Sequence, residues 1–110
     1  MRWPLWRVAV AERSMEPALY PGDWLVVCRT IVPGRPLRVR PGQVVVARDP
    51  KRLDLLIVKR AARREPGGWW LASDNPAAGA VDSRAFGVVP PSLIEGRMLV
   101  RYRRARRGGP

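Results

Sequence analysis

Two residues of this chain, Ser14 and Lys59, have the types and surroundings of a hydrolytic pair. Ser14 lies in the segment SMEPALYPGDWLVV, where Pro17 and Pro21 stiffen the turn that follows the serine. Lys59 lies in the apolar run LLIVKRA. The sequence contains no histidine, so a Ser-His-Asp triad is excluded. A lysine that has lost its proton is the remaining candidate for the base that activates Ser14.

The pattern around Lys59 favours a lowered pKa. Alternation along a strand places Lys59 on the same face as Leu55 and Ile57. Desolvation by such neighbours favours the neutral amine, and only the neutral amine can accept the serine proton. Each residue also has a simpler interpretation. Lys59 could extend its ammonium into water at the end of a strand, and Ser14 could merely cap a turn.

The composition narrows the class of function. The formal net charge is +12, with 19 Arg against 2 Lys. This charge favours anionic partners, or it reflects a bias toward arginine and a solvated tail. With one cysteine, Cys28, and no histidine, the chain has almost no ligands for a transition metal. We therefore expect no metal and no cofactor.

Two further classes of partner are disfavoured. The five tryptophans lie mostly in apolar segments, where core packing is expected rather than stacking on bases, so no specific nucleic-acid binding is expected. No apolar stretch approaches the roughly 18–20 residues of a membrane-spanning helix. A cytoplasmic protein is expected, with a peripheral membrane protein as the alternative.

The apolar segments are short and are separated by proline and glycine. With 12 Pro and 10 Gly, no segment sustains a long helical period. We expect a small, mainly β, antiparallel domain over residues 1–103 that protects its own edges, followed by a disordered basic tail at 104–110. One short helical turn is expected near 91–94. Strands are expected near 5–11, 24–30, 43–48, 54–62, 68–73 and 96–103.

Three segments resemble, in the same order, the three sequence boxes of the signal peptidase I family. SMEPALYPGDWLVV resembles the nucleophile box, IVKRA the lysine box, and DNPAAGAVDSRAFGVVP the third box. Together they take in most of residues 12–90. The resemblance implies an antiparallel β-fold of the signal peptidase or repressor-cleavage-domain type. It also implies a serine endopeptidase with Ser14 as nucleophile and Lys59 as general base.

The same resemblance implies which residues support the site. The backbone amide of Ser14 would bind the oxyanion, and Asp82 and Arg84 would form a structural ion pair. The implied supporting positions are Met15, Asp74, Asn75, Asp82, Ser83 and Arg84.

The chain departs from the family pattern in three places. The position two before the nucleophile, often a hydroxyl that donates to the oxyanion, is Glu12. Loss of one such donor typically lowers the rate about 10²–10³-fold. The position two before Asp82, usually a serine that helps to orient the lysine, is Ala80, or Gly79 if the extra residue of spacing is allowed for. The lysine box ends in REPGG rather than the usual PGD.

Within the family, the chain most resembles the soluble maturation proteases of nickel-type superoxide dismutase. These are similar in length and carry a version of the DSRxFG string, here residues 82–87. The resemblance implies a protein precursor as partner and removal of its N-terminal propeptide, with the extended substrate bound along an exposed sheet edge.

Three alternatives remain open. One is a signal (leader) peptidase at a membrane surface, where Trp3 and Trp6 would meet the interface instead of closing the core. Another is a catalytically weak member whose basic tail binds anionic partners. The third is a self-cleaving domain of the repressor type, for which the chain has no evident cleavage loop.

Overall fold

The computed structural model describes residues 5–29, 38–78 and 81–103. Within these residues six strands form one sheet in the spatial order β1-β2-β6-β3-β4-β5, and all neighbours are antiparallel. The mainly β, antiparallel fold expected from the sequence is therefore confirmed. The expected tail, residues 104–110, lies outside the described residues, so the domain boundary after residue 103 remains a prediction. The strands are β1 (Leu5–Ala9), β2 (Trp24–Arg29), β3 (Val44–Asp49), β4 (Arg52–Glu65), β5 (Gly68–Ala72) and β6 (Ile94–Arg103).

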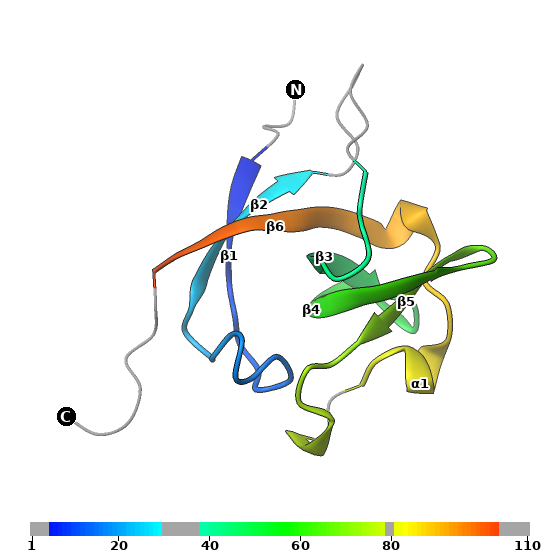
Figure 1. Cartoon of the computed structure of the whole chain (residues 1–110), viewed down its shortest axis with the longest axis horizontal. Helices are drawn as coiled ribbons and strands as arrows, with labels where there is room; N and C mark the ends of the chain where they lie inside the picture. The colour runs from blue at the N-terminus through cyan, green and yellow to red at the C-terminus, as the bar shows by residue number, and fades with distance from the viewer. Residues whose placement is uncertain (1–4, 30–37, 79–80, 104–110) are drawn as a thin grey trace.

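The long strand β6 joins the two halves of the fold. It pairs with β3 near its start and with β2 along the rest of its length (Figure 1). Gly96 is paired on both sides, with Arg29 of β2 and with Val46 of β3. A Cβ at this position would lie 2.6 Å from the carbonyl oxygen of Cys28 and 2.7 Å from the ring of Trp6. This position therefore requires glycine, because the neighbouring Cys28 backbone could make room for a side chain only by distorting the sheet.

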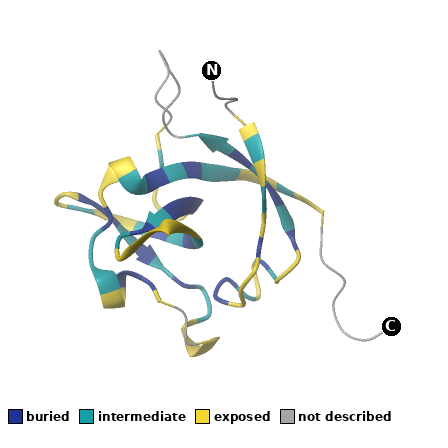
Figure 2. Ribbon diagram, turned by 180° about the vertical axis from the view of Figure 1, so that it is seen from behind, coloured by how far each residue is buried: buried dark blue, intermediate teal, exposed yellow. Residues whose placement is uncertain are grey.

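The core consists of two apolar clusters, and β3 contributes to both. Val44 and Val46 face one cluster, whereas Val45 and Ala47 face the other. Strand β3 is consequently buried on both faces, as its continuous apolar sequence indicates (Figure 2). The first cluster contains Val10, Met15, Leu19, Leu25, Val27, Val44 and Val46. The second contains Val45, Ala47, Ala61, Trp69, Leu71, Val89 and Ile94.

Strand β4 is longer than the expected range of 54–62. It pairs with β5 as far as Glu65 and Gly68, across a turn of two residues. Gly67, in this turn, has a φ of 90°, a conformation that favours glycine. The ladder therefore continues to the turn itself. The bounds of the other strands differ from the expected ranges by one or two residues, within the part of the chain that the structure describes.

The helical segments are short, and the sequence predicted one of them. The 3₁₀ turn η2 (Pro91–Leu93) falls at the turn expected near 91–94, whereas η1 (Pro76–Ala78) and α1 (Ser83–Phe86) were not predicted. Helix α1 is too short to show a helical period, so its cap at Asp82 is its main sequence signal. None of the helices in the described part of the chain has the length and apolar character needed to cross a bilayer.

Candidate active site

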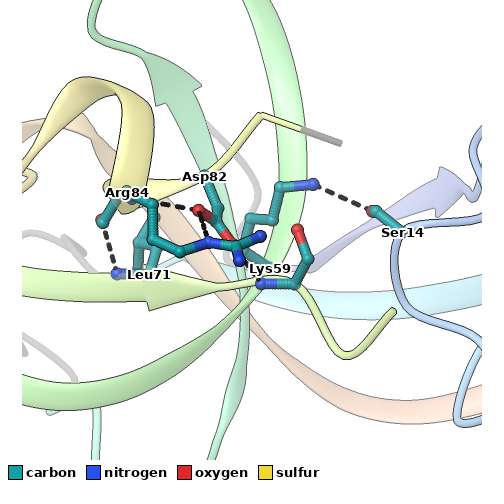
Figure 3. Close-up of polar contacts among 7 residues, drawn as sticks. Ser14, Lys59, Leu71, Asp82 and Arg84 are labelled. Carbon is teal, nitrogen blue, oxygen red and sulfur yellow. Dashed lines mark hydrogen bonds and ion pairs between the residues drawn. The ribbon is translucent and has the colours of Figure 1, made fainter. Parts of the chain in front are cut away.

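The side chains of Ser14 and Lys59 meet in the folded protein. The Lys59 Nζ donates a hydrogen bond to the Ser14 Oγ at 2.9 Å (Figure 3). Both residues are buried, with exposed fractions of 4% for Ser14 and 2% for Lys59. At this distance a neutral amine can equally accept the hydroxyl proton, as a general base must. The two residues that the sequence singled out are thus brought into direct contact.

Strand β4 carries Lys59 into the interior. Lys59 pairs with Val45 of the central strand β3, and Ile57 packs against the second core cluster. This agrees with the alternation predicted for Ile57 and Lys59, whereas Leu55, expected on the same face, is 38% exposed. The residues that bury Lys59 are therefore its neighbours Val45 and Ile57 rather than Leu55.

The environment of Lys59 favours its neutral form. Burial lowers the pKa of Lys59 from 10.5, although the carboxylates of Glu12, Asp82 and Asp49 act in the opposite direction. Desolvation is the largest of these effects, because a buried ammonium loses its hydration. The outcome is an amine that can lose its proton more readily than an exposed lysine can.

The turn that carries Ser14 is anchored on both sides. Met15 is fully buried in the first core cluster. Asn75 donates its backbone N–H to the Ser14 carbonyl oxygen at 2.7 Å and its Nδ2 to the Arg13 carbonyl oxygen at 3.1 Å. No described residue accepts a hydrogen bond from the Ser14 backbone N–H.

The expected ion pair of Asp82 and Arg84 is present, with Nε and Oδ1 3.2 Å apart. Asp82 is nevertheless held mostly by backbone groups, since it accepts hydrogen bonds from the N–H of Ser73 at 2.9 Å and of Arg84 at 3.0 Å. Burial alone would raise the pKa of the Asp82 carboxyl, but these hydrogen bonds and the Arg84 charge lower it below 3.8. The ionised carboxylate thus caps α1 and ties it to the end of β5.

Two other third-box residues, Asp74 and Ser83, make their hydrogen bonds with residues outside the dyad. The Ser83 Oγ accepts a hydrogen bond from the backbone N–H of Leu71 at 2.7 Å, which joins α1 to β5. Asp74 pairs with Arg60, the residue after Lys59, with Nε and Oδ1 3.2 Å apart. Both contacts hold the segments that surround Lys59. The sequence did not predict the role of Arg60, because its partner Asp74 lies 14 residues away, in the segment after β5.

A groove leads to the dyad between β1 and the first half of β4. Among the described strands, β1 pairs only with β2. The first half of β4 has no partner on the side of β5, because β5 pairs with β4 only from Arg60 onward. The cavity has a volume of about 290 Å³ and is mostly apolar. The residues that line the cavity are Val8, Ala9, Val10, Ala11, Glu12, Ser14, Met15, Leu55, Leu56, Ile57, Val58 and Lys59. The sequence did not predict most of them, since no local pattern identifies a groove formed by distant strands.

The remaining expectations from the sequence concern the tryptophans near the amino end, the positions of Gly79 and Ala80, and metal ligands. Trp6 packs against the first core cluster, with the Arg29 guanidinium 4.3 Å from its ring centroid. Trp3, Gly79 and Ala80 lie outside the described residues. Among the residues that are described, no three His, Cys, Asp or Glu side chains are grouped as metal ligands would be.

The antiparallel fold and the buried amine–hydroxyl contact define the Ser–Lys class of hydrolases. The comparison with known families agrees: the family model described as Peptidase S24-like matches residues 5–88. The chain therefore belongs to the Peptidase S24-like family and is a serine peptidase of the Ser–Lys dyad type. This confirms the expected kind of enzyme, but not the finer resemblance to dismutase maturation proteases. No curated protein matches the chain.

Proposed function

We propose that this protein is an endopeptidase in which Ser14 is the nucleophile and Lys59 the general base, and that it removes an N-terminal propeptide from a protein precursor. The observation that carries the proposal is the 2.9 Å contact between the Lys59 Nζ and the Ser14 Oγ, buried at the end of the groove. A structural lysine on this strand would not need to meet a serine from a distant turn.

The first half of the reaction forms an acyl-enzyme. The Ser14 Oγ attacks the carbonyl carbon of the scissile peptide while the Lys59 amine takes the hydroxyl proton. The C–O bond forms, and the carbonyl π electrons become the oxyanion. The Lys59 ammonium then gives its proton to the departing amide nitrogen as the C–N bond breaks. The products are an ester on Ser14 and a new amino terminus.

The second half hydrolyses the ester. Lys59, neutral again, takes a proton from water as the water oxygen attacks the ester carbonyl. Collapse of the tetrahedral species expels the Ser14 oxygen, which recovers its proton from Lys59. The Ser14 backbone N–H supports both oxyanions, because it has no acceptor among the described residues. The nearby carboxylate of Glu12 opposes this stabilisation.

The substrate binds as an extended strand in the groove. The free edge of β1 and the first half of β4 offer unpaired backbone groups to such a peptide. Because the lining is mostly apolar, we expect small or apolar side chains next to the scissile bond. Backbone pairing of this kind accepts many sequences, so the lining residues supply most of the selectivity.

The precursor of a nickel-type superoxide dismutase is the proposed substrate. Its support is the resemblance of residues 82–87 to the DSRxFG string of those maturation proteases. The cytoplasmic location and the anion-binding tail expected from the sequence remain predictions.

A specific observation favours one other substrate. Leu53, Leu55 and Leu56 of β4 are all exposed, and the latter two line the groove. Exposed apolar side chains beside the groove suit an enzyme that meets a leader peptide at a membrane surface.

The test compares the amino termini of cellular proteins in cells that contain the native protein, S14A, K59M or K51M. The K51M control changes the only other lysine of the chain. We expect cleavage with the native protein and K51M, and none with S14A or K59M. A new terminus on a dismutase precursor supports the proposed substrate, whereas termini on exported proteins support the leader-peptidase alternative. Retained cleavage in S14A or K59M contradicts the mechanism, and identical termini in all four samples contradict the proposed function.

A further inference from the structure

A buried hydroxyl near the dyad has no hydrogen-bond partner in the part of the chain that the structure describes. Ser73 is 9% exposed, and its Oγ makes no hydrogen bond within the described part of the chain. Burying a hydroxyl without a hydrogen bond is unfavourable, so such a group calls for an explanation. Ser73 does not line the groove, and the mechanism described above does not use it.

The strand register places Ser73 beside Lys59. Strands β4 and β5 pair Arg60 with Ala72 and Ala61 with Leu71. Ala61 and Leu71 are both buried in the second core cluster, so their side chains share a face. Continuing this register by one residue sets Ser73 opposite Lys59 on that same face, at the spacing of a cross-strand pair.

The Ser73 backbone is fixed from a second direction. Its N–H donates to the Asp82 Oδ2 at 2.9 Å, and Asp82 is close enough to Lys59 for its charge to affect that amine. Two residues later, Asn75 holds the Ser14 carbonyl oxygen. The segment that follows β5 therefore adjoins both members of the dyad.

The Lys59 amine has unused hydrogen-bond donors. Among the described residues its Nζ bonds only to the Ser14 Oγ. A neutral amine carries two N–H donors, and the ammonium formed after proton transfer carries three. The charged groups that act on Lys59 come from three segments: Glu12 after β1, Asp49 at the end of β3 and Asp82 before α1. No hydrogen bond joins any of them to Nζ.

We propose that Ser73 is a positioning residue whose hydroxyl accepts a hydrogen bond from the Lys59 amine. Rotation about the Cα–Cβ bond of Ser73 brings the Oγ toward Nζ. The bond holds the amine against Ser14 and gives the buried ammonium a neutral acceptor after proton transfer. This inference rests on the proposed role of Lys59 as the base.

The first test observes Lys59 without any substrate. The chain has only two lysines, so lysine labelled with ¹³C at Cε gives two side-chain signals; K59M assigns them, and Lys51 is the internal control. A charged donor gains more from the Ser73 acceptor than a neutral one does. We therefore expect the Lys59 titration midpoint to fall by about half to one pH unit in S73A. S73T, which keeps the hydroxyl, should titrate as the native protein does, and S73G provides a second variant without a hydroxyl.

The second test follows cleavage of the precursor. We expect kcat to fall about 10- to 100-fold in S73A, with KM nearly unchanged because Ser73 lies outside the groove. The acid limb of the pH profile should move with the NMR midpoint, and S73T should retain both values. A residue with only a structural role would lower stability without moving either one.

The outcomes separate this inference from the proposed function. If the Lys59 titration midpoint and kcat of S73A and S73G equal those of the native protein, the role of Ser73 is overturned. The dyad assignment then still stands, provided that K59M is inactive. Equal losses in S73T and S73A also overturn it, since packing rather than the hydroxyl would then be responsible. Cleavage by K59M would overturn the dyad instead.

Discussion

Asn75 holds the nucleophile turn through two neighbouring carbonyl oxygens. Its backbone N–H bonds to the Ser14 oxygen at 2.7 Å, and its Nδ2 bonds to the Arg13 oxygen at 3.1 Å, across a separation of 62 residues. The turn cannot rotate without breaking both bonds. The third box of the sequence therefore positions the first, and it does so through the backbone rather than through the reacting atoms.

Replacement of Asn75 should lower the rate with little effect on substrate binding. N75A removes the bond to Arg13 and keeps the backbone bond to Ser14, so the turn gains freedom and kcat should fall about tenfold. N75D keeps the shape of the side chain but loses the donor and should behave like N75A. Steady-state kinetics on the precursor provide the measurement. A native kcat in both variants would show that the backbone bond alone is sufficient.

The lowered pKa of Lys59 should make both activity and stability rise with pH. Cleavage requires the neutral amine, so the acid limb should have its midpoint below 10.5. For stability, the unfolded chain binds a proton on this lysine at pH values where the folded chain has already lost it. Stability from this group is therefore present above the unfolded pKa and is lost as the pH falls toward the folded pKa.

K59M isolates this contribution to stability. As the pH rises through that window, the unfolding free energy of the native protein should increase relative to that of K59M. The increase should be about 1.4 kcal/mol for each pH unit by which the pKa of Lys59 is lowered. Denaturant unfolding of both proteins at several pH values measures it. A difference that does not change with pH would show that Lys59 keeps an ordinary pKa.

Asp82 should matter more for stability than its ion-pair partner does. D82A removes the cap of α1 and leaves the buried N–H of Ser73 without an acceptor, which should cost about 2–4 kcal/mol. R84A should cost less than about 1 kcal/mol, because the Arg84 side chain is 60% exposed. Denaturant unfolding compares the two. Equal losses would mean that the ion pair, not the backbone contacts, holds the carboxylate.

The pH dependence of the Asp82 contribution has a definite sign. The folded pKa lies below 3.8, so the stabilisation is present above that value and is lost as the pH falls through the folded pKa. D82N, which cannot ionise, should lose less stability on acidification than the native protein. Parallel acid curves would contradict this assignment.

Glu12 should restrain the rate in two ways that can be separated. Its charge raises the pKa of Lys59, so E12A should move the acid limb to lower pH. E12S makes the same change of charge and adds a hydroxyl next to the oxyanion, which should raise kcat further, by up to about 10²-fold over E12A. The comparison of E12S with E12A measures the donor alone. Equal kcat values would show that this position does not reach the oxyanion.

Much of the fold was predictable because its signals are local. Alternating apolar residues and the proline and glycine between them predicted all six strands to within a few residues at their ends. Helix α1 was missed because four residues carry no period. The full length of β4 was missed because its end is stabilised by pairing with β5, which no local pattern records.

The sequence by itself determined the chemical types available at the site. A serine on a stiff turn, a lysine in an apolar run and the absence of histidine left one plausible pair. Only the tertiary structure decided that these two side chains, 45 residues apart, meet at 2.9 Å. It likewise decided that Arg60 holds Asp74, and it set the register of β4 and β5 from which we infer that Ser73 lies opposite Lys59. Contact and desolvation depend on the packing of several strands, and it is this packing that lowers the pKa of Lys59.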